Sequence, residues 1–167
     1  MFASYQPHEG TTEGYIGYGV KYAGVAGLTA NVAQQDVEGG VASNLDGEQT
    51  VIKIAYAVGP ITVTASDNDY ETGTGAASGV AAGADVGQKT RSYALAYTLS
   101  EALSVNIGTE TIDAPLGTDA EFTTFGASYT MGGMTLSAKR QTGDNTDHTT
   151  TAANDQEYFT TGISFAF

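Results

Sequence analysis

Apolar and polar residues alternate along most of this chain of 167 residues, and no segment shows the period of about 3.6 residues of an amphipathic helix. The alternating runs are about 10–12 residues long, whereas strands in globular proteins usually have about 5–6. A tilted strand needs roughly 9–11 residues to cross a bilayer. The pattern therefore predicts membrane-crossing strands at 12–23, 28–38, 48–58, 61–71, 89–100, 103–113, 121–131, 134–144 and 156–167, with a tenth strand at 1–7.

The connections between these strands alternate strictly between short and long. The short ones are "GVAG" at 24–27, "GP" at 59–60, "SEA" at 100–102 and "GG" at 132–133. The long ones are 39–47, 72–88, 114–120 and 145–155. The predicted sheet therefore has tight turns at one end and longer loops at the other, which is typical of up-and-down membrane barrels.

The two faces of the predicted sheet differ in character. One is apolar, as in Ile52, Ile54 and Val58, whereas the other has small polar residues such as Thr62 and Ser66. These small side chains do not fill a narrow barrel, so they favour the wall of a wide, water-filled one. Aromatics on the apolar face shortly before the short turns predict a belt at the membrane interface, formed by Tyr22, Tyr56, Tyr97 and Tyr129.

These features predict an all-β fold, an antiparallel up-and-down transmembrane β-barrel, with residues 1–167 in a single domain. The main alternative fold is a soluble β-sandwich, whose apolar faces pack inward. A sandwich normally has shorter strands, and it does not require aromatics at one rim only.

The charge of the chain narrows its range of partners. Nineteen acidic residues against six basic ones give a net charge of −13, which opposes nucleic-acid binding. Among the acidic residues, only Glu101 lies at the short-turn end of the predicted sheet. The others gather toward the long loops or the N-terminal segment, above a nearly neutral wall, so the loop end is expected to attract cations. The chain has no cysteine, which excludes disulfides and thiolate metal sites.

The last residues, "YFTTGISFAF", resemble the final strand of Gram-negative general diffusion porins, which ends in phenylalanine with alternating apolar residues behind it. The hairpin "GASYTMGGMTLSAKRQTGD" also resembles porins, particularly those of alphaproteobacteria. In that family, the outer-membrane insertion machinery reads the final strand. The resemblance therefore implies an assembly signal at Phe159, Ile163, Phe165 and Phe167.

The porin resemblance also implies a function and an assembly. Porins are homotrimers of barrels of about 16 strands, which pass ions and small hydrophilic solutes by passive diffusion. They lie in the outer membrane, in contact with its lipids and lipopolysaccharide. Because nine or ten strands are visible here, the chain is expected to be the C-terminal portion of a porin, with Met1 as an internal start. The opening "MFASYQPHEG" has no basic or apolar region of a signal peptide.

Four charged residues fall on the polar, lumen-facing side of the predicted strands: Lys21, Lys53, Glu110 and Lys139. Lys53 and Lys139 lie near mid-height, Lys21 nearer the short turns and Glu110 nearer the loops. In porins, basic wall residues opposite an acidic constriction loop set up a transverse field across the pore. The resemblance extends that role to Lys53 and Lys139, and the alternative is that both are ordinary solvated lysines of the lumen.

Other charged residues are expected on the lipid side or in the loops. Arg140 falls on the outward side, where a bulge or a subunit contact would explain it. Lys89 and Arg91, near the loop end, are expected to reach toward anionic lipopolysaccharide. Acidic clusters at 67–71 and 144–147 offer oxygen ligands for a loop-bound Ca²⁺, although neither has EF-hand spacing. Solvated acidic loops are the alternative interpretation.

The sequence shows no catalytic constellation, so we expect no enzymatic activity and no cofactor. His8 and His148 lie in polar contexts typical of solvated loops, without an HExxH or Ser-His-Asp setting. The segment "TGTGAASGVAAG" lacks the GK[ST] of a phosphate loop and is expected to be a surface loop.

Two alternatives to a porin stay open. One is a small closed ten-stranded outer-membrane barrel, acting as an adhesin or structural protein, in which 1–7 pairs with 156–167. The other is an outer-membrane enzyme with catalytic residues at the loop rim.

Overall fold

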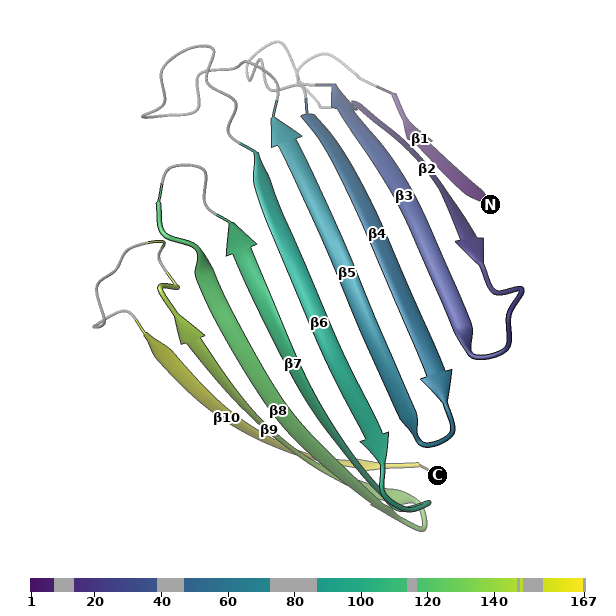
Figure 1. The fold of residues 1–167 in the computed structure, drawn as a ribbon, viewed down its shortest axis with the longest axis vertical. Coiled ribbons are helices and arrows are strands. Elements are labelled where there is room, and N and C mark those ends of the chain that lie inside the picture. The colour runs from purple at the N-terminus through teal and green to yellow at the C-terminus, as the bar shows by residue number, and fades with distance from the viewer. Residues whose placement is uncertain are drawn as a thin grey trace.

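The computed structural model describes residues 1–7, 14–38, 47–72, 87–113, 117–146, 148 and 155–166. Ten antiparallel strands form one sheet in which each strand pairs with its neighbours in sequence. The sheet is twisted and curved into an open half-barrel (Figure 1). Its strands are β1 (Phe2–Gln6), β2 (Gly14–Tyr22), β3 (Leu28–Glu38), β4 (Gly47–Val58), β5 (Ile61–Thr72), β6 (Gln88–Thr98), β7 (Leu103–Asp113), β8 (Ala120–Met131), β9 (Met134–Asp144) and β10 (Gln156–Phe165).

The structure confirms the predicted all-β, up-and-down architecture. Every strand begins and ends within two residues of its predicted boundary, and the tenth strand, expected at 1–7, is present as Phe2–Gln6. The agreement follows from the alternation, which continues to the end of each strand and stops at the turns. Within the described residues, no helix is apolar and long enough to cross a membrane.

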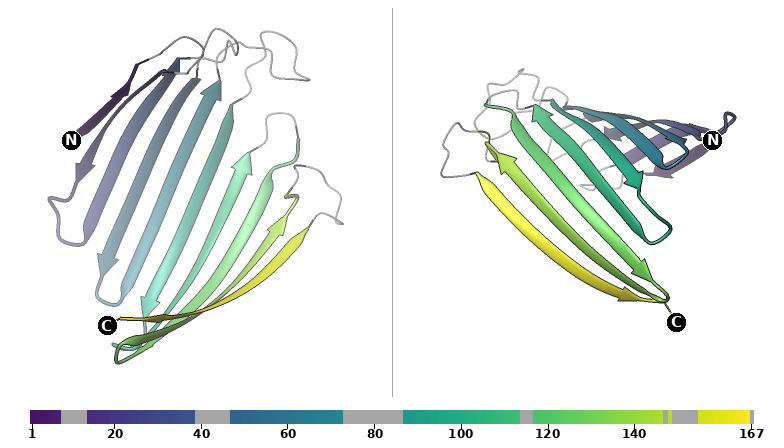
Figure 2. Two further views of the ribbon diagram at one scale, coloured as in Figure 1. Left: turned by 180° about the vertical axis from the view of Figure 1, so that it is seen from behind. Right: turned by 60° about the horizontal axis from the view of Figure 1, so that its bottom comes forward.

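The two edge strands of the sheet do not meet. The described residues of β1 pair with β2 alone, and those of β10 pair with β9 alone. Figure 2 shows the open side between these edges. The described strands therefore do not form the closed ten-stranded barrel in which 1–7 pairs with 156–167. They also form one layer, so the β-sandwich alternative is wrong.

Glycines shape the tight turns at one end of the sheet. Gly59 and Gly132 each take the first place of a two-residue hairpin loop, with φ of 55° and 60°. Glycine is favoured at that place in a type II′ turn, because a residue with a Cβ is strained there. Gly27, which precedes β3, has a φ of 78°. These left-handed glycines allow the chain to reverse in few residues, so the strands stay paired up to the turns.

The sheet has no hydrophobic core of its own. Within the described residues, Ala120 is the one buried hydrophobic residue. Large apolar side chains stand exposed on one face, such as Ile54 at 46%, Leu95 at 43% and Phe125 at 53%. Soluble monomers rarely expose apolar patches larger than a few hundred Å². This face therefore requires an apolar environment, as a lipid-facing surface does.

Candidate functional site

Cross-strand pairing fixes which residues share the polar face of the sheet. Directly opposed residues on neighbouring antiparallel strands lie on the same face, and side chains alternate between faces along each strand. One continuous row of the polar face runs from β2 to β9 through Lys21, Asn31, Lys53, Ser66, Ser92, Glu110, Phe122 and Gly143. This row brings residues that are far apart in the sequence onto one wall.

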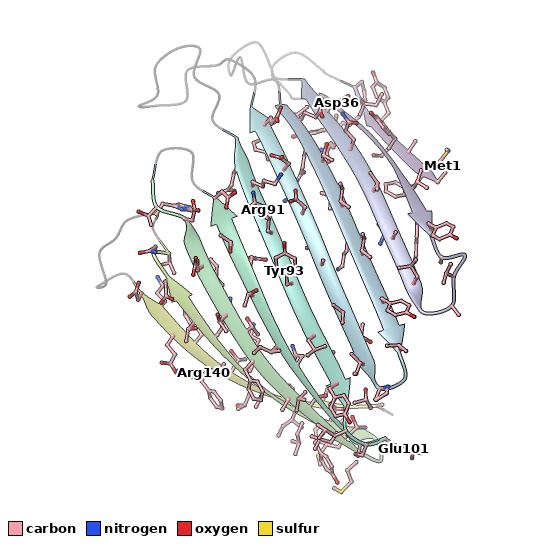
Figure 3. All side chains as sticks on the ribbon, viewed as in Figure 1. Met1, Asp36, Arg91, Tyr93, Glu101 and Arg140 are labelled. Atoms are coloured by element: carbon pink, nitrogen blue, oxygen red, sulfur yellow. The ribbon has the colours of Figure 1, made fainter. Side chains whose placement is uncertain are left out.

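The polar face of the described strands has an excess of positive charge. Lys21, Lys53 and Lys139 lie on it, against the single carboxylate of Glu110. The other charged side chains described within the strands lie on the apolar face, mostly toward the loop end. The described part of this face is therefore positively charged, whereas a nearly neutral wall was expected. Asp36 lies at the loop end of the sheet, while Glu101 lies at the opposite end (Figure 3).

Two of the four charged groups on the polar face have hydrogen-bond partners there. Ser92 Oγ donates to Glu110 Oε2 at 2.8 Å, and Lys139 Nζ donates to Gln141 Oε1 at 3.3 Å. Lys21 and Lys53 flank Asn31 on neighbouring strands, and both are exposed. All four residues thus lie on the predicted face, and their role in lining a pore stays a prediction.

A depression of about 240 Å³ opens on the polar face across β6 to β9. Ala94 and Gly108, opposite each other on β6 and β7, are the smallest residues lining it. The larger lining side chains on this face surround them: Ser92, Asn106, Glu110, Phe122, Thr124 and Gln141. The depression exists because two very small residues are opposed at its centre, and it places the one carboxylate of this face beside hydroxyl, amide and aromatic groups.

Arg140 lies on the apolar face, and its charge is paired. Its Nε donates to Glu157 Oε1 at 2.7 Å, and the side chain projects outward from the sheet (Figure 3). The pairing of β9 with β8 and with β10 continues without a break at this position. The expected bulge is therefore wrong, and the ion pair accounts for the outward charge. A subunit contact at Arg140 stays a prediction.

A second group of ion pairs lies on the apolar face, at the loop end of β5, β6 and β7. Lys89 Nζ lies 3.0 Å from Asp69 Oδ2 and 3.3 Å from Asp67 Oδ1. Arg91 contacts Asp113 Oδ2 at 3.1 Å and Asp67 Oδ2 at 3.6 Å. The two cations expected to reach toward lipopolysaccharide are thus engaged by carboxylates of the neighbouring strands.

The same contacts bear on the expected loop-bound Ca²⁺. Asp67 and Asp69, the aspartates of the 67–71 cluster, bind Lys89 and Arg91 and are not free to enclose an ion. In the second cluster, Asp147 lies outside the described residues. Within the part of the chain that the structure describes, no three His, Cys, Asp or Glu side chains come together as metal ligands.

His148 joins two connections at the long-loop end. Its carbonyl oxygen accepts from the N–H of Thr118 at 3.0 Å, and its ring Nδ1 lies 3.2 Å from the carbonyl oxygen of Thr118. Since a carbonyl only accepts, Nδ1 carries the proton. The residue is half-buried with a φ of 60°, so it is a structural contact rather than the expected solvated histidine. His8 and the glycine-rich segment lie outside the described residues.

The tyrosines of the predicted belt lie at one level of the sheet. Each is on the apolar face, within the last three residues of β2, β4, β6 or β8, and is 41–50% exposed: Tyr22, Tyr56, Tyr97 and Tyr129. Their rings are thus positioned at the short-turn rim, where an interface belt requires them. The contact with a membrane interface itself stays a prediction.

The predicted assembly residues lie on the edge strand β10. Phe159, Ile163 and Phe165 share its apolar face and are 60–71% exposed. Phe167 lies outside the described residues. Within the described residues β10 pairs with β9 alone, and the signal role of its apolar side chains stays a prediction.

Sequence reasoning missed the partners of the charged residues. Glu157 was not connected to Arg140, and Ser92 was not connected to Glu110, because each pair depends on the register between strands. Phe122 was also missed, although alternation with Thr124 places it on the polar face. That local signal was sufficient to find the aromatic group beside Glu110.

Comparison with known proteins supports the fold. No family model matches the chain, and no curated protein does. The fold is similar to a porin structure refined at 1.8 Å resolution, with a TM-score of 0.75 and 18% sequence identity over 93% of this chain and 52% of that one. It is also similar to an anion-selective porin from Comamonas acidovorans, with a TM-score of 0.73 and 15% identity over 99% of this chain and 58% of that one. The chain thus has a porin-type fold and spans just over half the length of these porins.

Proposed function

We propose that this chain forms part of the wall of an outer-membrane porin, a water-filled channel for the passive diffusion of ions and small hydrophilic solutes. The observation that supports this most is the difference between the two faces of the sheet. One face exposes large apolar side chains, and the other has small polar residues with lysines among them. A barrel wall between lipid and water needs this division. The proposal involves no chemical step and assigns no enzymatic activity to the protein.

The proposed location follows from the same division. The apolar face contacts outer-membrane lipids, with the tyrosine belt at the periplasmic interface. The acidic loop end faces the cell surface, beside lipopolysaccharide. By analogy with porins, we propose that the full-length protein is a homotrimer. Its migration on a gel in mild detergent, before and after heating, tests the trimer, and separation of inner from outer membranes tests the location.

Conductance tests the channel itself. Full-length protein added to a planar lipid bilayer is expected to raise the current in discrete steps. The size of each step should depend linearly on voltage, because ions diffuse freely through an open aqueous pore. Liposomes with the protein are expected to swell in solutions of small sugars. Protein that inserts as a heat-modifiable barrel but passes neither ions nor sugars contradicts the proposal.

A further inference from the structure

The depression around Glu110 combines groups that do not occur together elsewhere on the described polar face. Glu110 is the one carboxylate that the described strands present to this face. Ser92 Oγ donates to its Oε2 at 2.8 Å. This hydrogen bond orients the carboxylate and leaves Oε1 to accept from a solute. The negative charge is therefore held in place on a face whose other described charges are positive.

The surroundings of Glu110 offer both further acceptors and an apolar surface. Phe122 lies directly opposite Glu110 on β8, and its ring lies over Gly143, where an added Cβ would meet it at 2.8 Å. The hydroxyl of Thr124 and the amide of Asn106 line the same depression. The ring provides a face for a carbon chain or a cation, while the hydroxyl and amide oxygens accept hydrogen bonds.

We propose that this depression is a binding subsite for small solutes that carry one primary ammonium group on a short carbon chain. An ammonium group has three N–H donors, and Oε1 of Glu110 can accept from one of them while Ser92 holds Oε2. The carbon chain lies against Phe122 and above Ala94 and Gly108. The volume of about 240 Å³ suits a molecule of a few carbon atoms. The inference rests on the proposed channel, because the solute reaches the subsite through the lumen.

Other ligand classes fit the depression less well. Ca²⁺ takes 6–8 oxygen ligands, and Glu110 is the only carboxylate that lines this depression. A small anion is repelled by the same carboxylate. Lys139 lies two residues from Gln141 on β9 and donates to it at 3.3 Å, so a positive charge stands at the far rim. That charge disfavours a second ammonium group, and the subsite therefore favours monoamines over polyamines.

Planar-bilayer recordings with the full-length protein test the subsite, with n-butylammonium chloride added to a KCl solution as the probe. We expect the amine to reduce the K⁺ current in a saturable way. Glu110→Gln is expected to weaken the apparent amine affinity by about five- to tenfold, because it removes a charge-assisted hydrogen bond. Ala94→Leu, which fills the floor and keeps the charge, is expected to weaken it as well. Glu48→Gln is the matched control, because it removes a carboxylate from the apolar face of β4, and it is expected to leave the amine affinity unchanged.

The outcomes separate this inference from the channel itself. A channel that passes K⁺ but shows no saturable effect of the amine overturns the subsite alone. An equal loss of affinity in the Glu48→Gln and Glu110→Gln variants overturns it too, since it indicates a field effect of total charge. An unchanged affinity in Ala94→Leu places the amine outside the depression. Protein that gives no K⁺ current even without amine overturns the channel proposal, and the subsite with it.

Discussion

Arg140 and Glu157 form an ion pair on the apolar face, with Nε of Arg140 donating to Oε1 of Glu157 at 2.7 Å. Phe125 of β8 and Phe159 of β10 lie directly opposite Arg140 on either side. A charged side chain on a lipid-facing surface is unfavourable unless it is paired or reaches the interface. Each charge of the pair is therefore tolerated because of the other, and their effects on stability are coupled.

Removing one member of this pair is expected to destabilise the barrel more than removing both. Glu157→Gln leaves Arg140 as an unpaired cation between two aromatic side chains. The double variant Arg140→Gln/Glu157→Gln leaves no charge there. We expect the single variant to lose its folded, heat-modifiable form at a lower temperature than the double variant, as measured by gel shift after stepwise heating. Equal melting of the two variants contradicts the coupling.

Three acidic residues stand in one row of the apolar face near the loop end. Glu48 of β4 lies directly opposite Asp36 of β3 and Glu71 of β5. Like charges in directly opposed positions destabilise a sheet, by about 0.2–1 kcal/mol per pair. Glu48→Lys is therefore expected to raise the free energy of unfolding, measured with urea in detergent micelles without divalent cations. Glu101→Lys, at the short-turn end, is the control and should have little effect. A Glu48→Lys protein less stable than the parent refutes the repulsion.

The left-handed glycines differ in how much a side chain would disturb them. A Cβ at Gly59 would meet nothing within 4 Å, whereas a Cβ at Gly27 would meet the carbonyl oxygen of Ala57. Gly59→Ala is expected to cost about 1–2 kcal/mol, from its left-handed φ alone. Gly27→Ala is expected to cost more, because the backbone must also move. Urea unfolding compares them, with Gly59→Asn as a milder control since asparagine tolerates this region. Equal losses for the two alanine variants are the contrary result.

The strands, their ends and their faces could be predicted from the sequence, whereas the pairs between strands could not. Alternation is a local signal, so it places Tyr56 on one face and Lys53 on the other without knowledge of the neighbours. Glu157 is 17 residues from Arg140, and sequence alternation permits registers that differ by two residues. The depression around Glu110 could not be predicted for the same reason. Its walls come from four strands, and the register between these strands determines which side chains lie together.

Assembly is expected to depend on the apolar residues of β10. Phe159, Ile163 and Phe165 stand exposed on one face of this edge strand. If the insertion machinery reads that face, Phe165→Asn should sharply reduce the amount of heat-modifiable barrel in the outer membrane. Ser164→Asn, on the opposite face of the same strand, should reduce it much less. Similar yields from the parent and the Phe165→Asn protein would count against a signal in this strand.

The lysines of the polar face are expected to oppose the attraction of cations by the acidic loop end. Lys53 and Lys139 lie on that face, and their fields act within a Debye length of about 8–10 Å. Replacing both with Gln should therefore raise the cation-to-anion permeability ratio of the full-length channel by roughly twofold or more at 0.1 M salt. The reversal potential under a salt gradient measures this ratio.

A lysine on the apolar face provides the control that distinguishes the effect of the polar-face lysines from that of the total charge of the protein. Lys89→Gln removes the same charged group from the apolar face, where Lys89 binds Asp67 and Asp69, so it should shift the reversal potential much less. The effect of the double variant should also shrink at 1 M salt, where the Debye length falls to about 3 Å. Two results would contradict a role of Lys53 and Lys139 in the wall of the pore. One is a Lys89→Gln variant that shifts the reversal potential as far as the double variant does. The other is a shift in the double variant that persists at 1 M salt.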